Sequence, residues 1–396
     1  MPASPRTARA INDRLALRLL QQEGPLTAGQ LKQLTGLSRP TVADLVERLT
    51  AAGLISVVGE SGEQRRGPNA RLYGIVADRA HLAALDVRTE GVSVVVSDLL
   101  GAELARASVP IADDTGTGPA VEQAVTLVER AAKEAGAERL HTVGIGAPGL
   151  IDPATGELRD SSGLPEWHRR LVAALQERLP ARVLVENETN LAALAEQRDG
   201  AARDRDTFVL LWLGHGTGAA VILDGKLRRG ASGGTGEIGF LPVPGTSTLP
   251  SATDCEGGFH SLAGAAAVAG LAAECGVVVA EAAPHEPHAA TLVRQAAATS
   301  DAPASARFLD ALADRLAIGA ASVIAVLDPG CVVLGGEVGR AGGDVLAARV
   351  ASRLVRMSPL PTEVRASALG GGAVLRGALL TARDGAQEEL FAPRAG

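Results

Sequence analysis

At 396 residues the chain is longer than one ordinary domain, so we expect two or three domains. Its composition is typical of globular proteins, with 46% hydrophobic residues, 21% charged residues and a net charge of -7. Aromatic residues make up only 2%, which excludes a base-stacking platform for single-stranded nucleic acid. No apolar run reaches the roughly 18 residues that a membrane span needs.

The chain contains three cysteines, Cys255, Cys275 and Cys331, which are isolated from one another. Their number and spacing predict neither a disulfide framework nor a CxxC metal site. The basic N-terminal stretch lacks the continuous apolar segment and the cleavage site of a signal peptide. Together these features favour a reducing cytoplasm.

The charge is distributed unevenly along the chain. Residues 1–75 carry ten Lys and Arg against six Asp and Glu, whereas the remainder carries 28 against 39. A basic module on an acidic body would confine the attraction for DNA phosphates to one part of the protein. Many solvated helices carry a similar charge, so this asymmetry alone does not identify a DNA-binding module.

Three helical patterns follow one another at the N-terminus. The first spans residues 7–22 and ends at Gly24 and Pro25. Thr27 is expected to cap a short helix, AGQLKQLT, and Ser38 to cap a longer one that ends near residue 52. The apolar positions at helical spacing are Ile11, Leu15, Leu19 and Leu20 in the first helix, and Val42, Leu45, Val46 and Leu49 in the third. Two helices joined by a short turn at Gly36 form a helix-turn-helix pattern.

Two predicted strands, at about 54–58 and 70–76, follow the third helix and enclose a basic loop. A winged helix-turn-helix of this kind places the leading end of its second helix in the major groove and its wing along the backbone. The candidate DNA-binding residues are Ser38, Arg39, Pro40, Thr41, Arg65, Arg66 and Arg71. The alternative is a small helical protein-interaction module with solvated arginines. The order of caps, turn and wing favours the DNA-binding interpretation, with a domain that spans residues 1–76.

A second module, at residues 79–390, opens with three predicted strands, HLAALDV, GVSVVVSDLLG and AELARASVP. After a helix at about 118–135, strands such as HTVGIGA, VLVEN and FVLLWLG alternate with helices. The module ends with strand CVVLGG, a helix at 342–356, strand EVRASAL and a helix at 372–384. This pattern predicts an α/β module with two similar lobes, about 79–195 and 196–390, that face a cleft.

The second module resembles the ROK family of repressors, open reading frames and sugar kinases. The matching segments, in order, are LDVRTEGVSVVVSDLLG, GIGAPGLID, LPEW, VLVENETNLAALAE, LGHGTGAAVILDGKLRRGASGGTGEIG and DPGCVVLGG. The resemblance implies an actin/hexokinase-like ATPase-type fold with two lobes. With the winged module in front, the chain is similar to the family's repressor branch, which regulates xylose and N-acetylglucosamine use. Repressors of that branch are oligomers that release DNA when a sugar or a partner protein engages the kinase-like part.

The motifs that hold ATP in the family's kinases are degenerate in this chain. In the first phosphate turn, D-x-G-x-T, Arg88 replaces the glycine and Glu90 replaces the hydroxyl residue, which places a carboxylate where triphosphate would bind. The turn at 214–218 keeps its glycines, although His215 replaces a hydroxyl residue. The turn at Gly335 and Gly336 continues with Glu337 in place of a third glycine.

The family's catalytic base is an Asp, whose place is taken here by Glu188. The extra methylene moves the carboxylate, and a misplacement of about 1 Å can cost on the order of 100-fold in rate. We therefore expect a protein that is not an enzyme and needs no cofactor.

The structural zinc of many family members is also not expected here. Phe240 replaces the ligand histidine of the E-x-G-H motif, and the stretch SATDCEGGFHSLAG contains one cysteine, Cys255. One thiol and the nearby His260 do not make a four-coordinate site.

The residues that would contact a sugar are only partly retained. By resemblance, the candidate ligand-binding residues are Gly149, Asn187, Glu188, Glu237 and His260. Gly163 and Phe240 stand where the family has a contacting Asn and His. The alternative is that Asn187 only caps a helix and Glu237 only braces a loop. We expect an effector that is not a plain hexose or is bound differently, and Phe240 would suit a larger or decorated ligand.

Three functions remain open at this point. The first is an effector-responsive regulator of the repressor type that binds double-stranded operator DNA as a homodimer or dimer of dimers. The second is an active sugar kinase with a DNA-binding accessory. The third is a regulator without a ligand, whose kinase-like part is a scaffold for dimerisation and partner docking.

Overall fold

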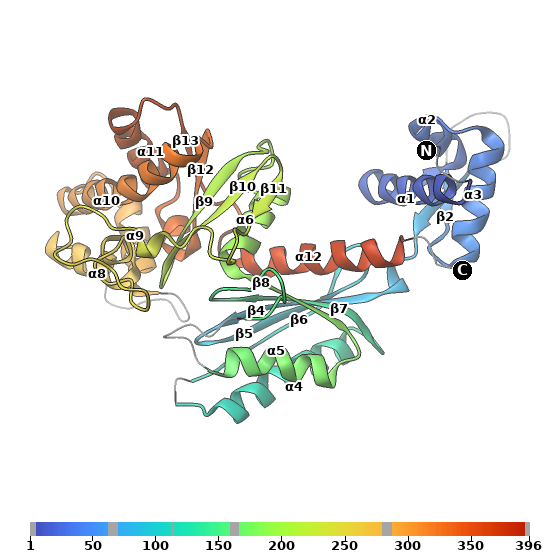
Figure 1. Ribbon diagram of the computed structural model, residues 1–396, viewed down its shortest axis with the longest axis horizontal. Coiled ribbons are helices and arrows are strands. Elements are labelled where there is room, and N and C mark those ends of the chain that lie inside the picture. The colour runs from blue at the N-terminus through green and yellow to red at the C-terminus, as the bar shows by residue number, and fades with distance from the viewer. Residues whose placement is uncertain (1–4, 62–69, 113, 159–165, 279–286, 393–396) are drawn as a thin grey trace.

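The computed structural model describes residues 5–61, 70–112, 114–158, 166–278 and 287–392. The molecule is elongated, with a small winged unit at one end, a first lobe in the middle and a second lobe at the other end (Figure 1). No helix in these described ranges is long and apolar enough to cross a membrane.

The winged unit consists of three helices and a small antiparallel sheet of order β1-β3-β2. Its elements are α1 (Pro5–Glu23), β1 (Leu26–Thr27), α2 (Ala28–Thr35), α3 (Arg39–Ala51), β2 (Ile55–Ser61) and β3 (Ala70–Ile75). The core between helices and sheet contains Leu31, Leu45 and Ile55, each at most 1% exposed. The predicted helix-turn-helix and the two strands after it are confirmed, and β1 is an addition that the sequence pattern did not indicate.

The predicted caps of α2 and α3 are also confirmed. The hydroxyl of Thr27 accepts from the backbone N–H of Gln30 at 3.2 Å, and the Gln30 side chain accepts from the backbone N–H of Thr27 at 2.8 Å. Gly36 ends α2 with φ of 70°, a conformation that favours glycine. Ser38 caps α3 by accepting from the backbone N–H of Thr41 at 3.3 Å.

The apolar face of α1 differs from the prediction. Leu20 is buried, as expected, but its buried neighbours are Ala16 and Leu17, while Ile11 is 58% and Leu15 is 39% exposed. The face that is buried contacts both the winged core and the first lobe, and this leaves Ile11 and Leu15 on the opposite side. The spacing therefore identified the helix but assigned two of its apolar residues to the wrong face.

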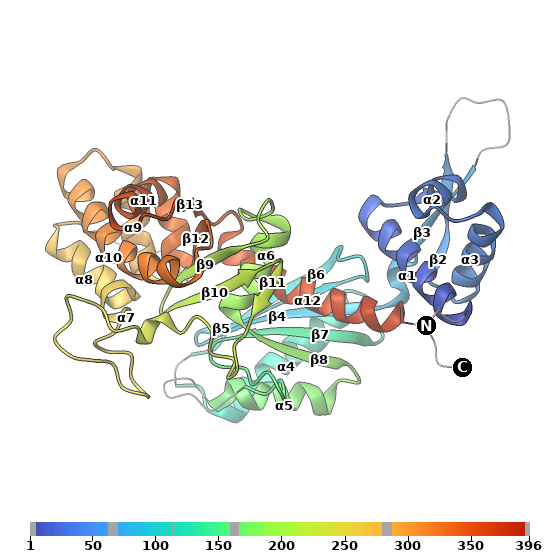
Figure 2. The ribbon, with the colours of Figure 1, turned by 45° about the horizontal axis from the view of Figure 1, so that its top comes forward.

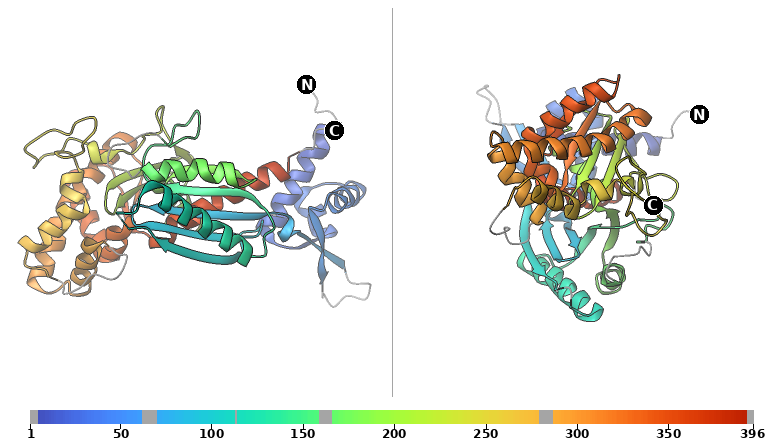
Figure 3. Two further views of the ribbon diagram at one scale, coloured as in Figure 1. Left: turned by 90° about the horizontal axis from the view of Figure 1, so that it is seen from below. Right: turned by 90° about the vertical axis from the view of Figure 1, so that its left-hand side faces the viewer.

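The first lobe is built on a sheet of order β6-β5-β4-β7-β8, in which β4, β7 and β8 are parallel and the other pairs antiparallel. Its strands are β4 (His81–Arg88), β5 (Gly91–Ser97), β6 (Glu103–Pro110), β7 (Leu140–Ala147) and β8 (Arg182–Asn187), preceded by the short turn η1 (Ala77–Arg79). Helices α4 (Thr117–Glu134) and α5 (Glu166–Arg178) cover one face (Figure 3).

The second lobe repeats this arrangement with the sheet order β11-β10-β9-β12-β13. Its strands are β9 (Phe208–Leu213), β10 (Thr217–Leu223), β11 (Lys226–Arg228), β12 (Cys331–Gly335) and β13 (Glu363–Ala366). Its helices are η2 (Ile238–Phe240), α7 (His260–Ala263), α8 (Ala265–Glu274), α9 (His288–Ala298), α10 (Pro303–Leu327) and α11 (Gly336–Met357). Helices α8 to α11 share one hydrophobic core with this sheet. The predicted pair of similar lobes is thus confirmed.

Two helices connect the lobes. Helix α6 (Glu188–Asp199) and, after the turn η3 (Gly370–Gly372), helix α12 (Ala373–Leu390) pack together. Helix α12 lies on the face of the first sheet opposite α4 and α5 (Figure 2). The second lobe is therefore not the continuous segment 196–390 that the sequence predicted, because the last helix returns to the first lobe.

The segment after β12 differs from the prediction in a second way. Helix α11 begins directly after the strand, at Gly336, and is interrupted at Gly343, where φ is 53° and ψ is -151°. The sequence predicted only the part from 342 to 356. The glycines at 342 and 343 resembled the start of a helix, whereas they mark a kink inside one.

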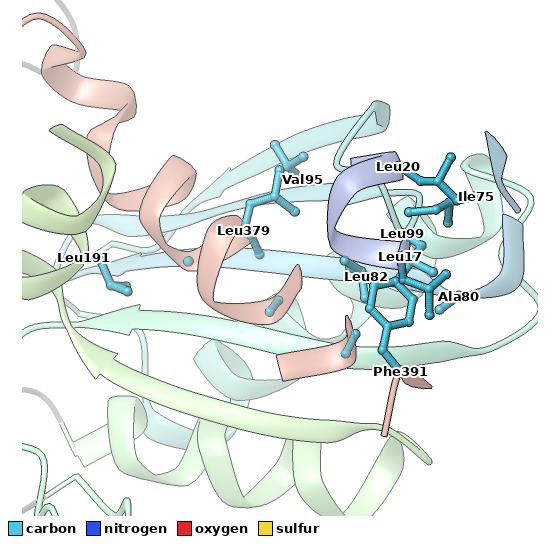
Figure 4. Packing of buried hydrophobic residues seen from close by; sticks show 14 of the residues in the cluster. Leu17, Leu20, Ile75, Ala80, Leu82, Val95, Leu99, Leu191, Leu379 and Phe391 are labelled. Carbon is cyan, nitrogen blue, oxygen red and sulfur yellow. The ribbon is translucent and has the colours of Figure 1, made fainter. Parts of the chain in front are cut away.

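The winged unit docks on the first lobe through apolar side chains. Leu17 and Leu20 of α1 pack close to Leu82 of β4, Leu99 after β5 and Phe391 at the end of α12 (Figure 4). All five are at most 6% exposed. The end of α12 is therefore part of the contact between the two units.

Candidate functional site

The leading end of α3 is open to solvent. Ser38, Arg39 and Pro40 are exposed. The Ser38 hydroxyl lies 2.8 Å from the Thr41 hydroxyl and accepts from the Thr41 backbone, so these two short side chains serve the cap. Arg39 makes no hydrogen bond or ion pair within the described ranges. Its guanidinium is the group at this end that is available to a base edge.

The wing is placed only in part. Arg71 is exposed on β3, in register with Glu60 of β2. Arg65 and Arg66 lie outside the described residues, together with the rest of the loop at 62–69. Their role in DNA binding stays a prediction.

The five candidate ligand-binding residues line a single cavity of about 1100 Å³ between the lobes. They are Gly149, Asn187, Glu188, Glu237 and His260. They come from the end of β8, the start of α6 and α7, and two loops. The carboxyl groups that line the cavity belong to Glu188, Glu237 and Asp254, and among the described lining residues no Lys or Arg balances them.

Asn187 has a structural role at this cavity. Its side-chain oxygen accepts from the backbone of Thr189 at 2.9 Å and of Asn190 at 3.3 Å, and its amide donates to the Gly149 carbonyl at 2.9 Å. Asn187 thus caps α6 and ties it to the turn at Gly149, as the alternative interpretation expected. One amide N–H remains for a ligand.

Glu186 and Arg229 form a contact across the lobes that sequence reasoning missed. Glu186 is 5% exposed, accepts from Asn190 at 2.9 Å, and accepts from the guanidinium of Arg229 at 2.6 Å. Arg229 follows β11 in the second lobe, and Glu186 lies in β8 of the first. The only indication in the sequence was two consecutive arginines ahead of the glycine-rich loop.

A tight backbone contact positions Glu237. The preceding Gly236 has φ of 93°, and a Cβ there would lie 1.8 Å from the Ala219 carbonyl oxygen, so only glycine fits. Glu237 makes no hydrogen bond through its side chain within the described part of the chain, and burial among protein atoms raises its pKa. The hydroxyl of Thr217, another lining residue, is buried and lacks a hydrogen-bond partner among the described residues. These polar groups are available to a ligand.

The pKa of the Glu188 carboxyl group is strongly shifted. Burial and the nearby Asp86 raise the pKa of Glu188 from 4.5 to about 8. The unfolded chain therefore ionises first, and this group lowers stability as the pH rises from about 4.5 to about 8. At neutral pH Glu188 is largely protonated and can donate a hydrogen bond.

Glu188→Gln tests this shift, because glutamine keeps the shape and stays neutral. We expect the variant to exceed the wild type in free energy of unfolding by about 1–3 kcal/mol at pH 8 and to converge with it near pH 4.5. Denaturant titrations at several pH values measure the difference. A difference that is constant across this range would contradict the raised pKa.

Arg88 forms contacts with residues of both lobes. Its guanidinium donates to Glu337 at 2.7 Å, to Asp86 at 3.0 Å and to the Gly371 carbonyl at 3.5 Å. The carboxylate of Glu337 lies against the turn at 214–218, since a Cβ on Gly214 would be 2.6 Å from its Oε2. An internal ion pair beside the turn at 214–218 thus joins the two lobes.

The residues at the family's zinc position do not fit a zinc ion. Phe240 ends the short turn η2 and contributes no ligand atom, and Cys255 is the single thiol of the following loop. The described residues contain no group of three His, Cys, Asp or Glu side chains that could hold a metal ion. That this protein works without zinc stays a prediction.

Sequence comparison decides the family. The profile of the ROK family matches residues 82–384, which is most of the chain. The chain belongs to the ROK family. A second profile, that of the MarR family, matches residues 11–67 in the winged unit. The predicted resemblance is confirmed.

Named relatives of this ROK protein include regulators and kinases. It is 27% identical over 243 residues to the DNA-binding transcriptional dual regulator NagC of Escherichia coli (strain K12), covering 59% of this chain and 58% of NagC. It is 25% identical over 239 residues to the xylose repressor of Caldicellulosiruptor bescii, covering 59% of each. The aligned parts are thus less than two thirds of either relative.

Solved structures confirm the predicted fold class. A ROK family transcriptional regulator, described as a homologue of the Escherichia coli MLC protein, matches 97% of this chain and 98% of that one, with a TM-score of 0.76 and 20% identity. The ROK family glucokinase of Streptomyces griseus, in complex with glucose and AMPPNP, matches 77% of this chain and 100% of that one, with a TM-score of 0.64 and 25% identity. The first match covers the winged unit as well as both lobes.

Proposed function

We propose that this ROK protein is a DNA-binding transcriptional repressor whose kinase-like domain senses a small effector and does not phosphorylate it. The observation that carries the proposal is a helix-turn-helix followed by the antiparallel strands β2 and β3, with the leading end of α3 exposed, joined to a ROK domain. The names of the relatives NagC and xylose repressor support it. DNA-binding domains of this kind insert the second helix of the motif into the major groove.

Arg39→Ala tests DNA recognition. If Arg39 contacts a base, the variant should lose about 1–3 kcal/mol of specific binding, or about fivefold to 160-fold in affinity. The measurement is fluorescence anisotropy on DNA from the region upstream of the protein's own gene, with excess nonspecific competitor. Glu47→Ala, an exposed position in the same helix, is the matched control. Unchanged affinity in Arg39→Ala would remove Arg39 from the recognition set.

The absence of kinase activity is supported by the ion pair at the phosphate turns. A bound nucleotide would have to displace Glu337 from the turn at 214–218 and separate it from Arg88. Asp86 and Glu90 would repel the phosphates further. Glu188 in place of the catalytic Asp adds a displaced carboxylate to this arrangement.

An active sugar kinase is the second candidate function. The turn at 214–218 keeps the glycines that a kinase needs, and a ROK glucokinase shares the fold. A coupled assay for ADP release, run with ATP, Mg²⁺ and a panel of sugars, separates the two proposals. We expect no ADP above the rate without protein, and sugar-dependent release would replace the repressor proposal with a bifunctional one.

The cavity between the lobes supports a neutral or cationic effector. Glu188 is largely protonated at neutral pH, but Asp254 and Glu237 also line the cavity and no described Lys or Arg lining residue is available to an anion, so a sugar phosphate would find no cation to bind. Its volume of about 1100 Å³ exceeds what a single hexose fills, which favours the larger or decorated ligand that Phe240 suggests. Calorimetry with free sugars, oligosaccharides and sugar phosphates tests this. Tight binding of a sugar phosphate would exclude it.

Helix α6 begins at the cavity with Glu188 and packs against α12, which supports a route from the cavity to DNA. Arg88 contacts the Gly371 carbonyl immediately before α12, and Glu196 of α6 accepts from the Ser367 hydroxyl at 2.5 Å and from the Leu369 backbone at 3.0 Å. From there α12 extends for 18 residues, or about 27 Å, to the contact with the winged unit. An effector that binds two lobe arrangements with different affinity would move this helix and the winged unit with it.

A homodimer or dimer of dimers would place two copies of α3 on a palindromic operator. Exposed apolar side chains support self-association. They include Ile11 and Leu15 on α1, Val326 near the end of α10, and Val355 and Met357 at the end of α11. Sedimentation velocity measures the oligomeric state, and a monomer at micromolar concentration on operator DNA would contradict this part of the proposal.

A further inference from the structure

A second cavity, of about 1030 Å³, lies at the junction between the winged unit and the first lobe. Its walls come from α1, the strands of the wing, the turn after β5, and the ends of α6 and α12. It shares no lining residue with the cavity between the lobes. We refer to it as the junction cavity.

Arginine is the dominant charged residue of the junction cavity. Arg14, Arg18, Arg198 and Arg383 line it, against Asp199, Asp384 and Glu388. Each acidic residue already has a cationic partner. Arg198 lies 2.6 Å from Asp384, Arg376 lies 2.6 Å from Asp199, and Arg14 lies 3.5 Å from Glu388.

Arg383 remains poorly compensated. Its side chain is 15% exposed, and its nearest carboxylate atom, on Asp384, is 3.9 Å from Nε. The buried Nε makes no hydrogen bond to any described residue. Burial, with the neighbouring Arg198 and Arg376, lowers the pKa of Arg383. A largely buried guanidinium whose one ion pair among the described residues is 3.9 Å long is poorly stabilised, and an anion beside it would stabilise it.

Arg18 of α1 is the second available cation. It is exposed, and no described residue forms an ion pair or hydrogen bond with it. The C-terminal end of α12, where a helix dipole stabilises a positive charge, does not explain the position of Arg383. Arg383 lies about two turns before the end of α12, beyond the last turn in which a helix dipole acts strongly.

We propose that the junction cavity binds a small oxyanion, with phosphate or carboxylate groups, between Arg18 of the winged unit and Arg383 of the first lobe. Guanidinium groups bind such oxygens in a bidentate way. The volume is that of small-molecule sites. An anion held by both arginines would link α1 to α12, and its effect on DNA affinity rests on the proposed function. Anion binding itself does not.

The test is calorimetry on the full chain without DNA, in a low-chloride zwitterionic buffer, with inorganic phosphate and with citrate as separate probes. We expect saturable binding of one anion per chain. Arg383→Gln and Arg18→Gln should each weaken it by about tenfold or more, because charge-assisted hydrogen bonds contribute about 1.5–3 kcal/mol. Arg106→Gln, in an exposed pair on β6, is the control and should not change it.

The two probes distinguish a ligand with phosphate groups from one with carboxylate groups. Binding of phosphate alone would indicate a phosphorylated ligand, and binding of citrate alone a polycarboxylate. If Arg383→Gln fails to fold, the exposed Arg18→Gln and the charge-conserving Arg383→Lys still test the site. Absence of saturable binding to the wild type, or equal binding by the wild type and both glutamine variants, would overturn the proposal.

Discussion

Arg88→Met is expected to lower the free energy of unfolding of the ROK domain by about 3–5 kcal/mol, because it removes one partner of a buried ion pair. Asp86 is 4% exposed, and its only hydrogen bond within the described chain comes from Arg88. Without the guanidinium, Asp86 and Glu337 lie close together with no cation between them. Burial already raises the pKa of Asp86, so its protonation would offset part of the loss. Guanidinium unfolding followed by circular dichroism at pH 7 measures the effect.

Two further variants show whether this loss comes from buried charge. Arg106→Met removes an exposed pair with Glu103 and is expected to cost less than about 1 kcal/mol. The double variant Arg88→Met with Glu337→Gln should be more stable than Arg88→Met alone, since it also removes an uncompensated carboxylate. A loss below that of Arg106→Met would contradict the role of Arg88 as the link between the lobes.

Phe391→Ala is expected to weaken the docking of the winged unit on the first lobe by about 3–5 kcal/mol, the usual cost of truncating a buried phenylalanine. Phe391 is 6% exposed and packs close to Leu17 and Leu82 (Figure 4). Hydrogen exchange of the full chain measures the result. Amides of α1 around Leu17 should exchange faster, while those of β9 and β12 in the second lobe should keep their protection.

The matched control for Phe391→Ala is Leu249→Ala, at a side chain that is 78% exposed. It is expected to change stability by no more than about 0.5 kcal/mol. If α12 transmits the effector response, Phe391→Ala should also retain DNA binding but lose most of the effect of the effector. Unchanged protection of α1 in Phe391→Ala would show that Phe391 does not hold the two units together.

Local chemistry made much of the winged unit predictable. The caps at Thr27 and Ser38 and the turn at Gly36 depend on side chains only a few residues apart, and each was recognised from the sequence. The faces of α1 were less predictable. Ile11 and Leu15 have helical spacing, but which side of the helix is buried depends on a first lobe that begins some distance along the chain.

The contacts between the lobes could not be predicted for the same reason. Arg88 was recognised as a replacement for glycine, and Glu337 as a further lost glycine, but nothing local indicated that the two form an ion pair. Arg229 and Glu186 likewise meet only when the lobes come together. The family resemblance brought Asn187, Glu188 and Glu237 together as candidates, and the structure places them around one cavity.

The sequence shows only a weak helical periodicity of apolar residues in parts of the second lobe. Helix α8, of sequence AAAVAGLAAE, has no polar face that alternates with an apolar one. Helix α12 has the usual pattern, yet its place on the first sheet depends on packing against β4 and β7, far away in the chain. Periodicity identifies such helices at best, and it does not assign them to a lobe.

Effector-controlled DNA binding by this protein is tested most directly by a fluorescence-anisotropy titration of the full chain onto DNA from the region upstream of its own gene. The titration is made at physiological salt with excess nonspecific competitor, and is repeated with free sugars, oligosaccharides and sugar phosphates. We predict specific binding that is weakened by an uncharged or cationic sugar and not by a sugar phosphate acting through the cavity between the lobes. Specific binding that no effector changes would favour the scaffold alternative. Binding that competitor DNA abolishes, on this region and on a genome-wide selection of fragments, would contradict the central claim.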